Sequence, residues 1–171
     1  MRPTPDRLRE SLFSILAPQI DGTTFIDAYA GSGAVGIEAL SRGAAQVIFI
    51  ERNANALAVL RENLDSLGVQ NEARILRGRA SILLAKEIAD IVFIDPPYDA
   101  EDEYAAALEV LGASECRLTI AQHSQRLQLS VNYGSLQKTR TVKQGDNVLT
   151  FFERAELTPS EAHKHPSHSS P

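Results

Sequence analysis

The sequence predicts a single α/β domain with a mostly parallel sheet, helices on both faces and an antiparallel pair of strands at its carboxyl-terminal edge. Short apolar segments alternate with amphipathic ones as far as about residue 121, which is typical of βαβ units. Two segments around a Gln-Gly-Asp turn, 134–142 and 147–153, predict the antiparallel pair. A chain of 171 residues with 43% apolar content can bury one core. We therefore expect a domain over residues 1–154 and a disordered tail, rich in Pro, Ser and His, over 155–171.

The chain opens with a predicted helix. Thr4 can cap this helix, and Pro5 suits its first turn. Apolar side chains then recur at helical spacing: Leu8, Leu12, Phe13, Ile15 and Leu16. We expect the helix to pack on the domain and to lie over the mouth of its binding site.

A strand, a glycine-rich turn and a second helix follow. Residues 24–28 predict a buried strand, and the turn beginning at Gly31 runs directly into a helical pattern. Gly31 and Gly33 permit positive φ and let a ligand approach the backbone, while Gly36 lets the helix pack closely on the sheet. This order of elements is the opening of a Rossmann-like unit and predicts a nucleoside site.

Carboxylates end the first two predicted strands. Glu51 follows the strand over 46–50, where an acid can bind the two hydroxyls of a ribose. Asp27 ends the first strand, just before the glycine turn. A carboxylate there would repel a pyrophosphate at the helix N-terminus, but it suits the cationic amino-acid tail of S-adenosylmethionine. The sulfonium of that cofactor also activates a methyl group.

The remaining elements continue the alternation. Residues 53–67 predict a helix that stops at Gly68 and turns four leucines toward the sheet: Leu57, Leu60, Leu64 and Leu67. Further along, the pattern predicts strands over 73–76, 90–94 and 117–121, helices over 79–86 and 101–111, and a short strand over 127–131.

The motif Asp95-Pro96-Pro97-Tyr98 follows the fourth predicted strand, at the edge where open α/β sheets bind ligands. An exocyclic amino group is a poor nucleophile because its lone pair is delocalised into the ring, so a site that methylates it must accept hydrogen bonds from its N–H groups. The Asp95 carboxylate and the Pro96 carbonyl offer two acceptors, and Tyr98 can stack on a base. The motif would also fit a plain strand end, since proline cannot continue a ladder. Beside a nucleoside site, it predicts methyl transfer to a nitrogen.

With both motifs in place, the chain resembles the bacterial methyltransferases that modify guanine N2 in 16S ribosomal RNA, a class I S-adenosylmethionine-dependent family. The resemblance covers about residues 1–154. The residues that carry it are Arg2-Pro3-Thr4-Pro5-Asp6-Arg7, Asp27-Ala28-Tyr29-Ala30-Gly31-Ser32-Gly33, the Asp-Pro-Pro-Tyr motif, Tyr133-Gly134 and Gly145-Asp146. It implies a seven-stranded Rossmann-like domain, S-adenosylmethionine as methyl donor, and 16S ribosomal RNA in a small-subunit assembly intermediate as substrate.

The resemblance also implies which residues form the site. The catalytic residues would be Asp95, Pro96, Pro97 and Tyr98. The cofactor-binding residues would be Asp27, Tyr29, Ala30, Gly31, Ser32, Gly33, Glu51, Arg52, Arg79, Ala80 and Asp95. Arg2 and Arg7 would bind RNA.

The chain departs from the family pattern at three places. After the third strand the family usually offers an Asp to the adenine amino group, whereas this chain has Gly78-Arg79-Ala80. We therefore expect backbone at Arg79 or Ala80, and apolar contact, to hold the adenine. Gln122-His123 stands where an acid followed by His is common, and we interpret His123 as structural. Members also usually carry a basic hairpin before the Arg-Pro-Thr segment, with which this chain begins.

Composition and charge narrow the classes of function. A net charge of −5 argues against coating nucleic acid by charge alone, so RNA contact must be local. Besides Arg2 and Arg7, the candidate cations are Arg9, Lys138, Arg140 and Lys143, and each fits a solvated surface equally well. The single cysteine, Cys116, cannot support a disulfide framework or a Cys-type zinc site, and it indicates a reducing cytoplasm. We expect no metal, no membrane span and a monomer.

Other functions fit parts of the same pattern. Adenine N6 or a protein glutamine amide is an alternative acceptor, because the Asp-Pro-Pro-Tyr chemistry does not distinguish these amino groups. From other classes, a nicotinamide-dependent oxidoreductase is disfavoured by Asp27. A non-catalytic RNA-binding scaffold is disfavoured by the intact motif.

Overall fold

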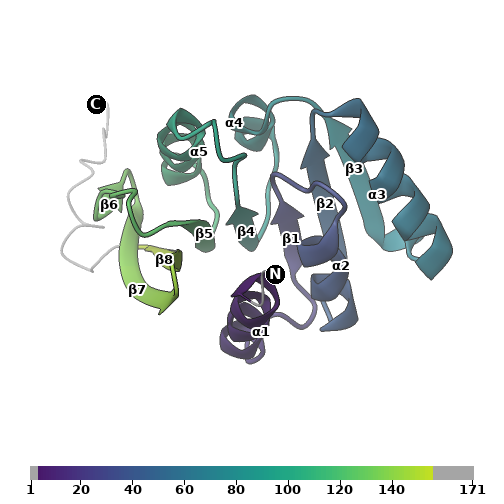
Figure 1. Cartoon of the computed structure of the whole chain (residues 1–171), viewed down its shortest axis with the longest axis horizontal. Helices are drawn as coiled ribbons and strands as arrows, with labels where there is room; N and C mark the ends of the chain where they lie inside the picture. Colours follow the sequence, from purple (N-terminus) through teal and green to yellow (C-terminus); the bar gives the residue numbers. More distant parts are fainter. Residues whose placement is uncertain (1–3, 156–171) are drawn as a thin grey trace, which may run out of the picture.

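The computed structural model describes residues 4–155, which form one sheet with helices packed on both of its faces (Figure 1). The sheet has eight strands in the order β3-β2-β1-β4-β5-β8-β7-β6. The first five in this order are parallel, and the last three pair antiparallel. The predicted α/β class and antiparallel edge are confirmed. Arg2, the tail over 156–171 and its histidines lie outside the described residues.

The elements follow the predicted order closely. The strands are β1 (Thr24–Asp27), β2 (Gln46–Glu51), β3 (Ala73–Arg77), β4 (Ile91–Ile94), β5 (Leu118–Ser124), β6 (Asn132–Tyr133), β7 (Leu136–Gln144) and β8 (Asn147–Arg154). The helices are α1 (Thr4–Leu16), α2 (Ala34–Ser41), α3 (Ala54–Leu67), α4 (Ala80–Leu83) and α5 (Asp102–Gly112), with 3₁₀ turns over Gln70–Glu72 and Leu84–Lys86.

The carboxyl-terminal part of the sheet differs from the prediction. The strand expected over 127–131 is wrong, because Leu127 and Leu129 pack against the core from a loop. The short strand β6 forms instead at Asn132–Tyr133, where it pairs with β7. This pairing gives the sheet eight strands rather than the expected seven.

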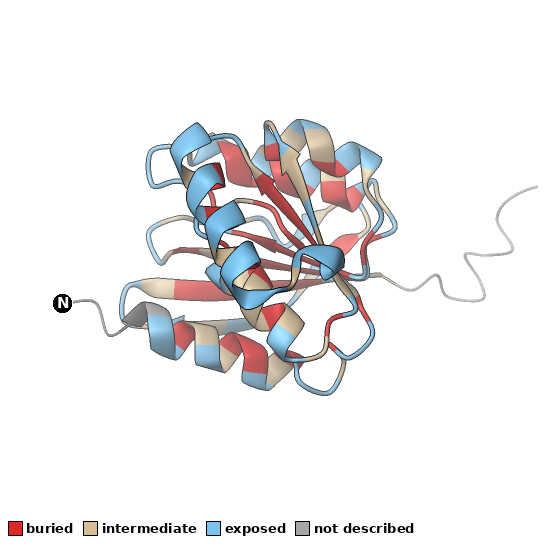
Figure 2. Cartoon of the chain, turned by 90° about the vertical axis from the view of Figure 1, so that its right-hand side faces the viewer, coloured by how far each residue is buried: buried red, intermediate tan, exposed pale blue. Residues whose placement is uncertain are grey.

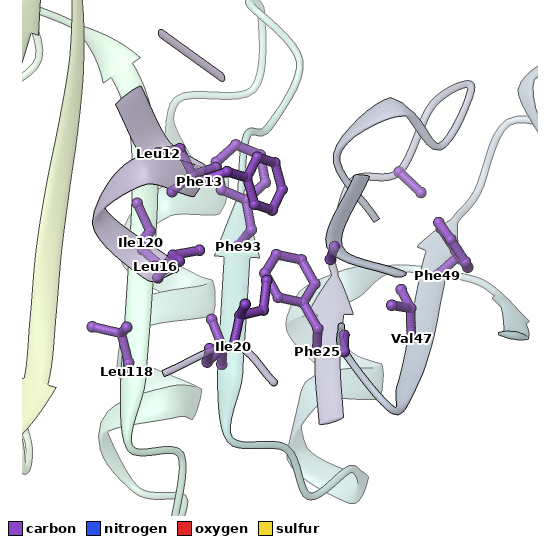
Figure 3. Packing of buried hydrophobic residues seen from close by; sticks show 14 of the residues in the cluster. Leu12, Phe13, Leu16, Ile20, Phe25, Val47, Phe49, Phe93, Leu118 and Ile120 are labelled. Atoms are coloured by element: carbon purple, nitrogen blue, oxygen red, sulfur yellow. The ribbon is translucent and has the colours of Figure 1, made fainter. Parts of the chain in front are cut away.

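Helices α1, α2 and α3 cover one face of the sheet, and α4 and α5 cover the other (Figures 1 and 2). On the first face, Phe13 of α1 stacks on Phe25 of β1 with ring centroids 6.5 Å apart. Figure 3 shows this pair beside the aromatic and aliphatic side chains of β2, β4 and β5. Leu57, Leu60 and Leu64 of α3 are buried there as predicted. Leu67 is 57% exposed, so its assignment to the core is wrong. It is the last residue of α3, which ends at Gly68 with φ +68°.

Helix α1 runs parallel to α2. Arg9 forms an ion pair with Glu38 at 3.3 Å, and one turn further along both helices the Arg42 guanidinium lies 5.7 Å from the centre of the Phe13 ring. Since α2 begins at the carboxyl edge of β1, the first turn of α1 also lies toward that edge of the sheet.

Candidate active site

A cavity of about 240 Å³ lies at the carboxyl ends of strands β1 to β4. Eight residues of the predicted site line it: Tyr29, Gly31, Glu51, Arg52, Arg79, Ala80, Asp95 and Pro97. Five further residues of the wall were not predicted: Ala28, Ile50, Gly78, Ala100 and Glu103. The fold therefore gathers the ends of four strands, far apart in the sequence, around one space.

The glycine turn forms one wall of the cavity. Gly31 has φ +56°, and a Cβ built on it would meet no atom within 4 Å, so the turn leaves open space where a side chain would stand. A Cβ on Gly36 would lie 2.4 Å from Cε1 of Phe49, which confirms that α2 needs a glycine there to pack on the sheet. Gly33, with φ +89°, is closed in by Leu60 in the same way. Gly31 thus leaves space for a ligand, while Gly33 and Gly36 allow the turn and α2 to pack closely.

Glu51 ends β2 and is held by the backbone around it. Its Oε1 accepts a hydrogen bond from the Gly31 N–H at 2.9 Å. Its Oε2 accepts from the N–H groups of Arg52 at 2.8 Å and Asn53 at 3.0 Å. A carboxylate has about four acceptor positions, so these three bonds fix its orientation and leave capacity for a ligand hydroxyl.

Asp27 lies behind the cavity wall rather than on it. The residue is only 2% exposed, and its Oδ2 accepts a hydrogen bond from the Gly36 N–H at 3.0 Å. Burial raises the pKa of Asp27 to about 7, against the lowering effect of that bond, and the charges of Asp95 and Glu51 raise the pKa further. Three acids are therefore concentrated around the cavity, and a cationic ligand would relieve their mutual repulsion.

Asp95 follows β4 at the open side of the cavity. The residue is exposed, yet the atoms around its carboxyl remove enough water to raise the pKa of Asp95 to about 6. Pro96 is buried, and the Pro97 carbonyl accepts a hydrogen bond from the Ala100 N–H at 2.9 Å. Tyr98 is 97% exposed and does not line the cavity. The motif thus presents one acid to the cavity and one aromatic ring to solvent.

Three side chains from separate elements meet at another part of the wall. Glu103 of α5 is 6% exposed, and its Oε2 accepts a hydrogen bond from the Tyr29 hydroxyl at 2.9 Å. Its Oε1 accepts from Arg79 Nε at 2.7 Å and forms an ion pair with Arg79 Nη2 at 2.7 Å. Burial and the bond to Glu103 raise the pKa of Tyr29, and Arg79's own bond to Glu103 raises the pKa of Arg79. We call these residues the Tyr29–Arg79–Glu103 cluster.

The other predicted site residues support the wall from behind. Ala30 is buried and donates its N–H to the Ile50 carbonyl at 2.9 Å, and the Ser32 carbonyl accepts from the Asn63 side chain at 2.9 Å. His123 is buried, as a structural histidine should be. Its Nε2 lies 2.7 Å from Thr150 Oγ1 and its Nδ1 lies 2.8 Å from the Ser124 carbonyl oxygen. No described residue of α1 lines the cavity, so the expectation that this helix covers its mouth is wrong.

Arg7 lies in a separate groove between α1 and β7. Its wall also contains Arg140, from the second predicted cationic segment, together with Glu10 and Gln144. Arg7 and Arg140 are exposed, and neither forms an ion pair with another residue of the 4–155 region. Gln144 pairs with Asn147, which pairs with Ser124 at the carboxyl end of β5. The groove therefore opens toward the edge of the sheet that carries Asp95.

Known proteins resemble this chain over nearly its whole length. A family model described as conserved hypothetical protein 95 matches residues 1–153. YlbH of Bacillus subtilis, provisionally named an rRNA methyltransferase, is 35% identical over 90% of this chain and 88% of its own length. Ribosomal RNA small subunit methyltransferase D of Escherichia coli K12 is 45% identical over 57% of this chain, and the match spans half the length of that protein.

Solved structures agree with these matches. The protein yhhF of Escherichia coli, provisionally named a methyltransferase, superimposes with a TM-score of 0.81 at 29% identity, over 91% of this chain and 90% of its own. An RNA methyltransferase from Salinibacter ruber, solved in complex with S-adenosyl-L-homocysteine, gives a TM-score of 0.68 at 17% identity, over 92% of this chain and 96% of that one. The latter likeness concerns the fold alone.

Proposed function

Since this chain belongs to the family described as conserved hypothetical protein 95, we propose that it is an S-adenosylmethionine-dependent methyltransferase that modifies the exocyclic N2 of a guanine in 16S ribosomal RNA. The observation that carries the proposal is the position of Asp95. Its carboxyl stands on the open side of a cavity whose other walls are the Gly31 turn and the Glu51 carboxylate. The name of the Escherichia coli relative supplies the substrate class.

The residues around the cavity fit the proposed donor. Glu51 keeps acceptor capacity for ribose hydroxyls, Ile50 and Ala80 offer apolar surface to a base, and the concentration of acids suits a positive charge. The cavity is slightly smaller than typical ligand pockets, which begin at about 300 Å³, so part of the donor would lie in the open mouth beside Asp95. When bound, S-adenosylmethionine supplies a methyl group activated by a positively charged sulfur.

Asp95 and Pro96 would prepare the acceptor nitrogen. The ionised Asp95 carboxylate accepts a hydrogen bond from one N–H of the amino group, and the Pro96 carbonyl accepts from the other. These bonds draw electron density onto the nitrogen and turn its lone pair toward the donor. Tyr98, almost fully exposed, would stack on a base extruded from the RNA. The protein supplies orientation and polarity, and the reaction needs no covalent intermediate.

The proposed substrate is RNA in a small-subunit assembly intermediate, and we propose Arg7, with Arg140, as a contact to its backbone. The groove that holds both arginines opens at the catalytic edge of the sheet, which supports this role. We further propose that the protein acts in the cytoplasm as a monomer, in line with its one free, buried cysteine. Within residues 4–155, no helix is long and apolar enough to span a bilayer.

Methyl transfer from tritium-labelled S-adenosylmethionine to separate acceptors tests this function. The acceptors are deproteinised 16S RNA, small-subunit particles lacking the modification, DNA and total protein. We expect label in the particles or the 16S RNA, at a guanine. Label confined to adenine or to protein glutamine would show that one of the alternative acceptors is the substrate. No label in any acceptor would contradict the proposed methyltransferase activity.

A further inference from the structure

Glu103 is a buried acid on the cavity wall that the proposed reaction does not use. Burial of an ionised carboxylate is unfavourable unless other groups compensate it. Here the Arg79 guanidinium pairs with Oε1, and the Tyr29 hydroxyl donates to Oε2 at 2.9 Å. These partners come from the loops after β3 and β1, so the carboxylate is held from two sides.

Within the cluster, Glu103 has one spare acceptor position, on Oε2. Oε1 of Glu103 receives both contacts from Arg79, and Oε2 receives only the Tyr29 hydroxyl. A carboxylate oxygen has two acceptor positions, so Oε2 can accept one more hydrogen bond. Arg79 already directs Nε and Nη2 at Glu103. A ligand that meets the cluster at Glu103 is therefore favoured if it brings an N–H donor.

The order of strands places this cluster at the base-binding end of the cavity. The proposed transfer occurs beside Asp95 after β4, and the ribose acid Glu51 ends β2. In the sheet order β3-β2-β1-β4, the side beyond the ribose is the end of β3. Gly78, Arg79 and Ala80 follow β3 and line the cavity there, with Glu103 bound to Arg79.

We propose that Glu103 determines which purine the cavity accepts, by receiving a hydrogen bond from the 6-amino group of the donor's adenine. This inference rests on the proposed function, because it assumes a purine nucleoside in the cavity. Arg79 acts as the positioning residue, since it holds Oε1 of the carboxylate through two contacts of 2.7 Å. A buried acceptor rejects a ligand that offers another acceptor, so a 6-oxo purine should bind poorly.

Binding of two probes by calorimetry tests the role of Glu103. The probes are S-adenosylhomocysteine and S-inosylhomocysteine, which differ in the 6-amino and 6-oxo groups. We expect the wild-type protein to prefer the adenosyl probe about tenfold or more. Glu103→Gln provides an N–H as well as an acceptor at nearly the same shape, so the preference should fall to within about twofold. Tyr29→Phe is the matched control: it removes a bond to the same carboxylate but keeps the acid, and the preference should persist.

The outcomes separate this inference from the proposed function. Equal binding of the two probes by the wild-type protein would overturn the role of Glu103 and leave the proposed donor intact. Equal weakening of both probes by Glu103→Gln, with the preference unchanged, would mean that the acid only ties the loops together, and would also overturn it. Binding of neither probe by the folded wild-type protein would overturn the proposed donor itself.

Discussion

The two ends of the cavity are built differently. At the proposed nucleoside end, polar groups are already paired: three backbone N–H groups hold Glu51, and two side chains hold Glu103. At the acceptor end, Asp95 forms no hydrogen bond to another side chain within residues 4–155, and Tyr98 is 97% exposed. The end with Glu51 and Glu103 is therefore held by internal hydrogen bonds, while the end with Asp95 and Tyr98 is open to hydrogen bonds and contacts from a substrate.

This difference suggests a division of roles. A rigid, pre-paired end lowers the entropy cost of binding, which suits the donor site. An exposed acid with an elevated pKa and a free aromatic ring suit a substrate that is large and supplies its own hydrogen-bond donors. Changes at the acceptor end should therefore affect turnover, and changes at the nucleoside end should affect donor affinity.

The largest effect is expected from Asp95→Ala. Removing the acceptor for the amino N–H should reduce kcat by about 10²- to 10³-fold, a typical cost for one preorganised hydrogen-bonding group. The Kd of S-adenosylhomocysteine should change by less than about threefold, because Glu51 and the Gly31 turn remain. Single-turnover kinetics and calorimetry on one preparation measure both quantities. Joint loss of turnover and donor binding would break the division between the two ends.

Gly31→Val should produce the opposite result. A branched side chain would stand in the open space of the cavity and raise the Kd of S-adenosylhomocysteine about tenfold or more. Gly22→Val is the matched control, since Gly22 also has positive φ, +74°, with no atom within 4 Å of a built Cβ, but does not line the cavity. Both variants carry similar backbone strain. Normal donor affinity in Gly31→Val would place the donor elsewhere.

Asp27→Asn should stabilise the protein above neutral pH. The pKa of Asp27 is raised to about 7 in the folded state, so folding becomes less favourable as pH rises from about 4 to 7 and the buried acid must ionise. An amide keeps an acceptor for the Gly36 N–H without the charge. We expect a gain on the order of 4 kcal/mol in the free energy of unfolding at pH 8, vanishing below about pH 4. Urea titrations at both pH values measure it, and a gain that does not depend on pH would contradict the cause given.

The pH profile should report the acid at the acceptor end. Because the pKa of Asp95 is raised to about 6 and only its ionised form accepts the amino N–H bond well, kcat/KM should fall about tenfold per unit as pH drops below 6. Above that pH it should be level until another group titrates. Constant kcat/KM down to pH 5 would mean that the ionisation of Asp95 does not limit the reaction.

The smallest effect is expected in the groove between α1 and β7. Arg7→Ala with Arg140→Ala should weaken RNA binding and reduce the slope of log K against log salt by about 1.4 to 1.8, which corresponds to two phosphate contacts. Arg61→Ala, an exposed arginine on α3 outside the groove, is the control and should leave the slope unchanged. Filter binding across a salt series gives the slopes. Equal slopes for all variants would remove Arg7 and Arg140 from the RNA interface.

The sequence predicted the parts of the site whose chemistry is local. Asp95 follows a buried strand within one motif, Gly31 lies in the turn after β1, and Glu51 ends the neighbouring strand β2, so strand patterns alone placed them at one edge. Glu103 carries no such signal, because it is one acid among several at the start of α5. It joins the site only through contacts with Tyr29 and Arg79, 74 and 24 positions away.

The errors in the predicted elements also arise from tertiary contacts that the sequence pattern does not show. Helical spacing assigned Leu67 to the core, but α3 ends at that residue and leaves it 57% exposed. Apolar Leu127 and Leu129 suggested a strand, whereas tertiary packing buries them partly within a loop. Periodicity shows which side chains favour burial, but the neighbouring elements decide where each is placed.

Nucleoside-resolved mass spectrometry of 16S RNA tests the central claim most directly. Small-subunit particles that lack the modification would be incubated with S-adenosylmethionine and either wild-type protein or Asp95→Ala. We expect one equivalent of N2-methylguanosine with the wild-type protein and a much lower yield after the same time with the variant. Another methylated nucleoside, or equal yields from the two proteins, would contradict the assignment of Asp95 to a guanine amino group.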